Sequence, residues 1–197
     1  MTMNTKAWYN TAYVSIQGLS GTEYQLQTKT TSFSQSGGNP DIEGLETFGG
    51  KITKLSTNED LEISFDGIPT SHADFDWIFA GQTTSTAFGA SGSIITTSAG
   101  GVKYRVTVLW TDQPSITSAA RHAITNNYEA YKKSWADCYC TGLETSMDAG
   151  DVLKATLTFK TTEEDADGTN NWYIAAKDTT SGTLSAMNAF TSSTTKW

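Results

Sequence analysis

An alternation of apolar and polar residues within the segment 59–68 constrains the fold of this 197-residue chain more than any other feature. The two sets fall on opposite sides of an extended segment: Leu61, Ile63 and Phe65 against Glu62, Ser64 and Asp66. A period of two residues is typical of a β-strand with one buried and one exposed face. The segment predicts a sheet with one face in a core and the other in solvent or along a wet channel.

The composition favours the same fold class along the rest of the chain. Thr and Ser make up roughly a quarter of the residues, and Thr is β-branched while Ser favours turns. Only three prolines occur, so composition forbids few strands. Further strands are predicted over 12–18, 103–111, 134–143 and 152–161, the last two as a hairpin. We expect an all-β sandwich or barrel of two packed antiparallel sheets with one short flanking helix.

The predicted helix runs over 71–81. Ser71 and Asp74 have the spacing of a helix-capping pair, and Gly81 suits the residue that ends a helix. Between them lies an apolar stripe at helical spacing, made of Phe75, Ile78 and Phe79. These three side chains are expected to pack the helix against a sheet.

A long polar hairpin is predicted over 23–55. Its turn is expected within the dense cluster of turn residues Gly37, Gly38, Asn39, Pro40 and Asp41. Two polar strands around one turn bury little by themselves and need a neighbour. The tip is therefore expected to contact another subunit.

The character of the chain changes near Thr162. Residues 1–162 are expected to form the β domain, and residues 163–197 an acidic turn followed by an arm rich in Ser and Thr. A strand could cover 172–176. The segment 178–197 has only scattered apolar residues, so it is expected to be weakly ordered in a free subunit and ordered against a neighbour.

The chain is acidic, with a formal net charge of −8 and a pI near 4.6. Proteins that clamp nucleic acid or bind anionic membranes need basic surfaces, so both functions are disfavoured. The polar start and the lack of a long apolar run predict synthesis in a cytoplasm, without a leader or a membrane span. Cys138 and Cys140 would point to the same face of one strand as reduced, buried thiols.

Neither catalysis nor metal binding is indicated by the residue pattern. Of the two histidines, His72 belongs to the segment Ser71–Asp74, which helix capping explains, and His122 has no metal-ligand spacing. The acidic segment Glu163–Gly168 resembles the first half of a calcium loop, but Ile174 stands where a bidentate Glu is needed. An acidic turn is the preferred interpretation. We expect no catalytic residue, no metal and no cofactor, and the chain is not expected to be an enzyme.

A carbohydrate-binding β-sandwich is the alternative function. The chain has six tryptophans and eight tyrosines, and exposed aromatic rings on an acidic sandwich would suit sugar stacking. However, Trp77 falls in the predicted helix, and Trp110 and Trp135 fall in or beside strands, where burial is the usual outcome.

The order of these elements resembles the major tail tube proteins of tailed viruses. The resemblance is carried by three segments and by the closing strand: Phe48–Lys54, Leu61–Gly67, Phe75–Gly81 and Leu153–Lys160. It extends over about residues 13–162 and is diffuse between them at 82–101 and 113–133.

The resemblance implies a structural virion subunit. Members of that family fold as two packed antiparallel sheets with a flanking helix and form rings, usually of six subunits, that stack into a hollow tube. Inner strands of neighbouring subunits join to line a channel for DNA ejection, and loops join the rings. The implied partners are further copies of the chain, other tail proteins, and DNA that passes without specific binding. The negative charge suggests Glu62 and Asp66 as candidates to face the lumen.

Overall fold

The computed structural model describes residues 11–19, 23–26, 32–36, 42–47, 50–55, 60–68, 103–113, 122–124, 128–146, 154–178 and 183–197. Its strands, in chain order, are β1 (Thr11–Gly18), β2 (Glu23–Leu26), β3 (Ser32–Ser36), β4 (Ile42–Thr47), β5 (Gly50–Leu55), β6 (Asp60–Gly67), β7 (Tyr104–Thr111), β8 (Ala130–Ser146), β9 (Lys154–Thr162) and β10 (Trp172–Lys177). No helix occurs within these ranges, so the described chain is all-β, as predicted. The expected helix over 71–81, with Phe75, Ile78 and Phe79, lies outside them.

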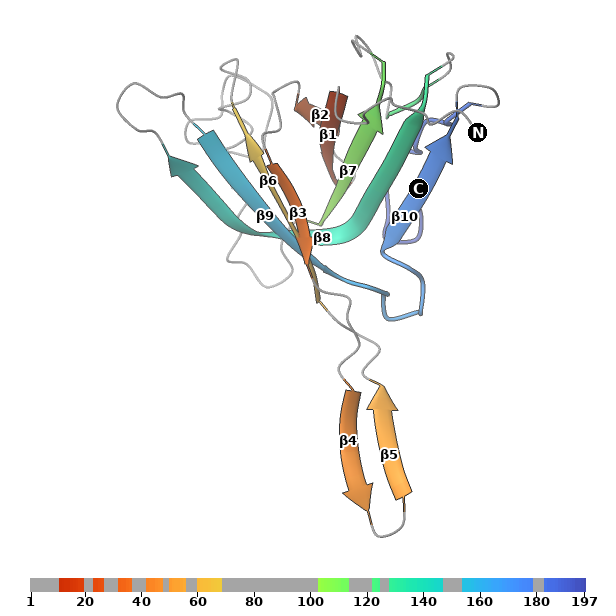
Figure 1. Cartoon of the computed structure of the whole chain (residues 1–197). Helices are drawn as coiled ribbons and strands as arrows, with labels where there is room; N and C mark the ends of the chain where they lie inside the picture. The colour runs from red at the N-terminus through yellow and green to blue at the C-terminus, as the bar shows by residue number, and fades with distance from the viewer. Residues whose placement is uncertain are drawn as a thin grey trace, which may run out of the picture.

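One continuous antiparallel sheet folds over on itself along β8 (Figure 1). The first part of β8 pairs with β7 on one side and β10 on the other, and its second part pairs with β9. We call β2, β1, β7, the first part of β8 and β10 the covered layer. The second part of β8, with β9, β6 and β3, is the open layer. The two packed sheets that the sequence predicts are therefore two layers of a single sheet.

The bend in β8 lies at a bulge around Asp137. The register between β7 and β8 shifts there, and Asp137 has a left-handed backbone with φ of 52°. A bulge inserts an extra residue into one strand, bends that strand and increases its local twist. Asp tolerates the left-handed region better than most residues with a side chain. The bulge thus lets one 17-residue strand serve both layers.

The apolar core lies between the two layers. Valines and an isoleucine of β1 and β7 meet alternating residues of β6 and β9 from the open layer. The fully buried members include Val14, Val106, Ile63, Leu157 and Phe159. Phe159 stacks on Phe65 across the β6–β9 ladder with ring centroids 5.9 Å apart. The period-two patterns at 61–66 and 153–159 thus gave the correct buried residues wherever they are described.

The predicted hairpin over 23–55 is wrong in its pairing. β2 pairs with β1 in the covered layer, whereas β3 pairs with β6 in the open layer. β4 pairs only with β5, in a separate two-stranded sheet in which Thr47 is the partner of Gly50. The polar strands look alike in sequence, and their partners are chosen by long-range pairing that no local pattern encodes. The expected contact tip, Gly37–Asp41, lies outside the described residues.

The C-terminal segment packs on its own subunit, contrary to the expectation that 178–197 orders only against a neighbour. Residues 183–197, here called the strap, lie on the outer face of the covered layer. Leu184, Met187 and Phe190 of the strap are all buried. These three apolar side chains are sufficient to seat the strap, and polar contacts hold the rest. Among the described residues there is no helix long and apolar enough to cross a membrane.

Candidate functional site

The outward face of the open layer is a regular polar surface, and we call it the open face. Paired residues of an antiparallel ladder share a face, so the strand registers define its members. They are Ser34 and Ser36 of β3; Glu62, Ser64 and Asp66 of β6; Lys154, Thr156, Thr158 and Lys160 of β9; and Tyr139, Glu144 and Ser146 of β8. Hydroxyl groups dominate this face, and its acids alternate with lysines.

Both predicted lumen residues belong to the open face, and each has a partner there. Glu62 forms an ion pair with Lys160, with 3.2 Å between Oε2 and Nζ. Asp66 accepts a hydrogen bond of 2.6 Å from the Thr156 hydroxyl. The face is therefore close to neutral instead of strongly acidic. The structure places these residues on a solvent-facing surface, while their position in a channel remains a prediction.

Within the described residues, the open layer ends in two strand edges that pair with no other strand. There β3 pairs only with β6, and the second part of β8 pairs only with β9. The side chains of residues 34–36 and 144–146 at these edges are exposed. β3 reads Ser-Phe-Ser-Gln-Ser, without the Lys or Pro that usually protects an edge from pairing with another chain. These edges are chemically suited to continue the sheet into a second molecule.

The outer face of the covered layer is closed by the strap and is rich in buried polar groups. Arg105 donates hydrogen bonds to the carbonyls of Asn188 and Lys196, at 2.6 and 2.9 Å, and to Gln17 Oε1 at 2.8 Å. Lys132 donates to the Ser185 carbonyl at 2.7 Å. Desolvation by burial, followed by the neighbouring Arg105, lowers the pKa of Lys132 to about 8. Two cations thus fix the strap through its backbone.

The far end of the strap is held by its own lysine. Lys196 Nζ lies 2.6 Å from Asp165 Oδ2 and 2.7 Å from Asn171 Oδ1, and the side chain is 2% exposed. Asp165 also accepts from the backbone N–H groups of Asp167 and Thr169. The Lys196 hydrogen bond, with these N–H groups, lowers the pKa of Asp165. The acidic segment at 163–168 is thus a turn whose carboxylate binds an ammonium group, and no cluster of metal-ligating side chains occurs among the described residues.

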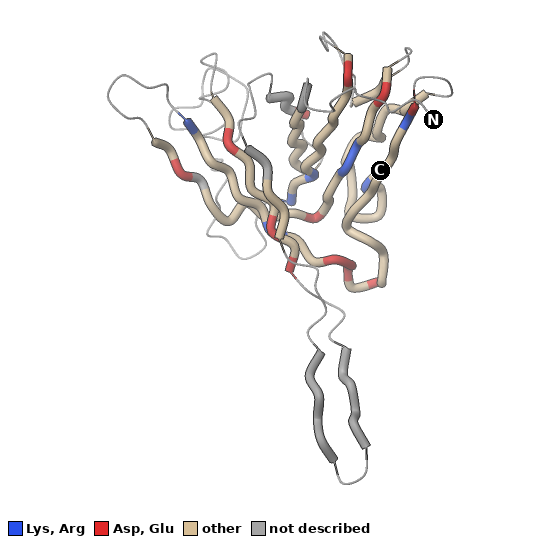
Figure 2. The backbone as a smooth tube through the Cα atoms, in the orientation of Figure 1, with Lys and Arg blue, Asp and Glu red and all other residues tan. Residues whose placement is uncertain are grey.

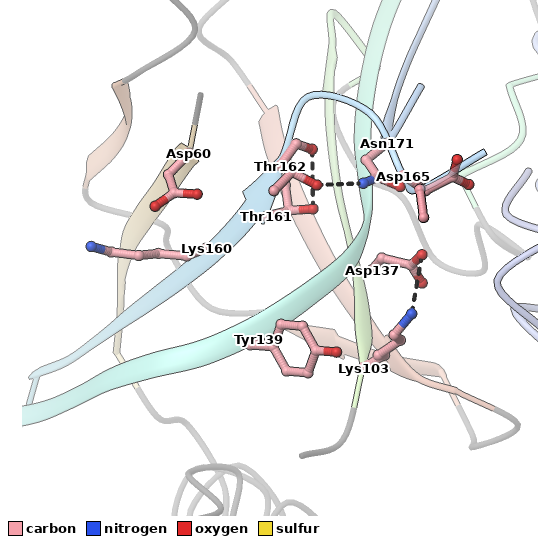
Figure 3. Close-up of a pocket in the computed structure, with 10 residues that line it drawn as sticks. Asp60, Lys103, Asp137, Tyr139, Lys160, Thr161, Thr162, Asp165 and Asn171 are labelled. Carbon is pink, nitrogen blue, oxygen red and sulfur yellow. Dashed lines mark hydrogen bonds and ion pairs between the residues drawn. The ribbon is translucent and has the colours of Figure 1, made fainter. Parts of the chain in front are cut away.

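Figure 2 shows acidic residues, in red, along this turn. A pocket of about 320 Å³ lies at the bend of β8, where the open face meets the turn (Figure 3). The residues that line it include Asp60, Asp137, Tyr139, Lys103 and Lys160. Asp137 forms an ion pair with Lys103 at 3.3 Å, and Lys160 is engaged by Glu62. The charges at this pocket largely neutralise one another. Its ion pairs therefore link neighbouring segments of the fold and do not form a charged ligand site.

The two cysteines and the tryptophans agree with their sequence-based interpretation. Cys138 and Cys140 are free, buried thiols in the core cluster. Burial raises the pKa of both thiols, that of Cys140 to about 11. Trp135 is fully buried, and Trp110 packs partly buried against the core. These two rings offer no exposed platform of the kind that sugar stacking requires.

Sequence reasoning missed the residues that close the covered layer. Arg105 falls in the strand predicted over 103–111, and Lys132 lies just before the strand predicted over 134–143; the sequence pattern assigned a buried role to neither residue. A weak signal was available in β7, whose sequence YRVTVLWT has β-branched residues on both sides. Only the position of the strap, more than 80 residues away from Arg105, shows that both faces are buried.

Comparisons with known proteins return structures but no sequence relatives. No protein-family model matches the chain, and no curated protein matches it. Among solved structures, the chain is similar to a component of the anti-feeding prophage baseplate, with a TM-score of 0.47, 9% identity, and coverage of 90% of this chain and 99% of that one. The chain is also similar to one from the sheath/tube terminator of the PVC extracellular contractile injection system. That match has a TM-score of 0.47 and 13% identity, and covers 89% of this chain and 99% of that one.

A crystal structure of an Hcp protein is also similar, with a TM-score of 0.38, 11% identity, and coverage of 85% and 98%. The structures found are thus components of injection systems and Hcp proteins. Scores below 0.5 at such low identity do not by themselves assign a function. The functional argument therefore depends on the chain's own faces and edges.

Proposed function

We propose that the chain is the structural subunit of a tail-type tube and that it works by assembling with copies of itself. The observation that carries this proposal is the open layer: a polar, nearly neutral face that ends in two unprotected edges. A closed ring removes such edges, and head-to-tail contacts generate rings when the rotation closes. The resemblance of the sequence to tail tube proteins supports the same class. We expect no catalytic activity.

The number of strands in the open layer favours ring closure through β3 and β8. Within the described ranges the layer has four antiparallel strands, in the order β8, β9, β6, β3. Because four is even, β8 of the next subunit, related by rotation about the channel, would run antiparallel to β3. The ladder would continue without reversing either molecule. A ring of six subunits, as the resemblance implies, would exceed the roughly 16–18 strands that already enclose an aqueous channel.

In this arrangement the open face would line the channel. Its hydroxyl groups and matched charges present neither a basic surface that would hold phosphates nor an apolar surface that would hold protein. DNA passage fits such a lining, because a nearly neutral polar wall neither binds nor strongly repels a polyanion. Stacked rings, other tail proteins as partners, DNA ejection and a location in the virion tail are parts of this proposal.

Ring closure can be tested with a matched pair of single substitutions on the open face. Ser34 and Ser64 are cross-strand partners, but Ser34 lies on the edge strand and Ser64 in the layer's interior. Ser34→Glu brings a negative charge towards the edge of β8 that carries Glu144, and should abolish rings and tubes in negative-stain images. Ser64→Glu adds the same charge to the same face and should still assemble. Equal assembly by both variants would show that β3 is not the ring contact.

The lumen assignment has a separate test. Glu62→Lys combined with Asp66→Lys changes the charge of each subunit by four units, and both positions face solvent in the single subunit. Tubes should still form and should now retain DNA at low salt but release it at high salt. Tubes that form without any gain in DNA affinity would place these two residues outside the channel.

A further inference from the structure

A buried polar cluster around His122 lies beneath one end of the strap, apart from the open face. His122 is fully buried, and its Nε2 lies 2.5 Å from the Ser15 hydroxyl. Ser15 in turn donates a hydrogen bond of 2.7 Å to Glu23 Oε1. The ring of Tyr13 contacts the imidazole edge-on, with centroids 5.1 Å apart. Strands β1 and β2 of the covered layer thus both contact this histidine.

The hydrogen bonds define which nitrogen of His122 carries the proton. Because the Ser15 hydroxyl donates to Glu23, it must accept from His122, so Nε2 bears the hydrogen. Nδ1 then carries a lone pair, and within the described residues it has no hydrogen-bond partner. The order of donors is the reverse of that in a nucleophilic triad, where the serine donates to the histidine. The cluster is therefore structural, not hydrolytic.

Protonation of His122 would place a new N–H donor at Nδ1, in a buried site that offers it no acceptor among the described residues. The nearby charges act in both directions. Glu23 Oε1, 4.0 Å from Nε2, favours the charged ring, whereas the cations Lys132 and Arg105 oppose it. Burial, with these two cations, lowers the pKa of His122 to about 3.

His122 is connected directly to the strap. It has a left-handed backbone, with φ of 57°, and leads into Ile124. Ile124 and Leu184 form an isolated antiparallel bridge with two hydrogen bonds, of 3.0 and 2.9 Å, between their backbones. Both side chains belong to the apolar cluster under the strap. An outward movement of His122 would therefore strain the bridge that fixes this end of the strap.

We propose that His122 is an acid-sensitive latch: in its neutral form it holds the strap on the covered layer, and on protonation it leaves its site and releases residues 183–190. Release would uncover Arg105 and Lys132 on the outer face of the layer while leaving the core between the layers intact. The latch does not depend on whether the subunit forms tubes.

The test is backbone hydrogen exchange between about pH 7.5 and about pH 5, expressed as protection factors to remove the intrinsic pH dependence. The amides of Ile124 and Leu184 should lose protection by up to about tenfold per pH unit, the limit for one coupled proton. The amides of Leu157 and Phe159 in β9 should keep theirs. Equal losses in β9 would indicate global unfolding, and constant protection at Leu184 would exclude the latch.

Two substitutions make the test specific. His122→Asn keeps a residue that tolerates the left-handed backbone but cannot titrate, so the loss at Leu184 should vanish. His72→Asn removes the other histidine and should leave the loss unchanged. If neither His122→Asn nor His122→Gln folds, an NMR titration of the His122 imidazole in the wild-type chain tests the proposal instead. Titration of His122 near its ordinary pKa, with Leu184 still protected, would overturn the proposal.

Discussion

The two layers of the sheet are built from similar strands, but the outer face of one layer is buried and that of the other is partly exposed. In the covered layer, six consecutive residues of β7 are buried, because the core lies on one side and the strap on the other. In the open layer, β6 and β9 alternate between buried and partly exposed residues. The chain thus closes one outer face with its own C-terminal segment. In the part of the chain that the structure describes, no such segment covers the open face.

This difference also separates the residues that stabilise the subunit from those proposed to act in assembly. Substitutions under the strap or in the core should destabilise the subunit, whereas substitutions on the open face should leave it folded. The predictions below contrast the two layers, with a control on the open face wherever one is available.

The largest effect is expected in the shared core. Phe159→Ala removes a fully buried ring that stacks on Phe65, and should lower the free energy of unfolding by about 3–5 kcal/mol. Its sequence neighbour Thr158 lies on the open face, where Thr158→Ala should change stability by less than about 0.5 kcal/mol. Urea titration of both variants measures the contrast. Similar losses would mean that the open face is not solvent-exposed in the folded subunit.

The next effect tests the polar anchoring of the strap. Arg105→Met removes donors to two carbonyls and to Gln17, and should cost about 3 kcal/mol because buried acceptors lose their partners. Lys160→Met removes a cation of the open face whose ion pair is half exposed, and should cost at most about 1 kcal/mol. Thermal unfolding of both variants distinguishes them. An unchanged thermal stability of Arg105→Met would show that packing alone holds the strap.

A smaller and more local effect is expected at the end of the strap. Lys196→Met leaves Asp165 and Asn171 without their ammonium partner, and should cost about 1–3 kcal/mol. The loss should be confined to the strap, since Arg105 still binds backbone carbonyls there. Carboxypeptidase digestion should therefore accelerate while the β9 amides keep their exchange protection. Unchanged digestion would place the anchoring of the C-terminus elsewhere.

The most gradual effect is the pH dependence of global stability in the wild-type chain. The folded-state pKa of His122, about 3, lies below its unfolded value near 6.5, so the unfolded chain binds more protons between these values. Stability from the neutral imidazole is fully present above about pH 6.5 and declines as pH falls, by at most about 1.4 kcal/mol per pH unit. Asp165, with its lowered pKa, adds a loss in the same direction at lower pH.

The urea midpoint measured between about pH 7 and about pH 4 checks this slope. His122→Asn should flatten the upper part of the curve, above the range in which carboxylates titrate. A midpoint that stays constant down to about pH 5 would mean that His122 is accessible to protons in the folded state.

Local patterns determined the all-β class and most of the strands. The alternation at 61–66 and 153–159 specifies buried faces, because a strand side chain has only two directions to take. For the same reason, the sequence placed Glu62 and Asp66 on a polar face and buried both cysteines. The hairpin of 134–143 with 152–161 was also predicted correctly, since these strands are adjacent in the chain and strongly patterned.

Tertiary structure alone decided which strands pair and which faces close. The polar strands between residues 23 and 55 have no apolar period to select a partner, so the separation of β2 from β3 across two layers depends on distant strands. Likewise, Arg105 and Lys132 become buried only because the strap, far along the chain, supplies carbonyl oxygens that replace water around their charges. A local pattern encodes the faces of a strand, but the neighbour that covers each face is a property of the whole fold.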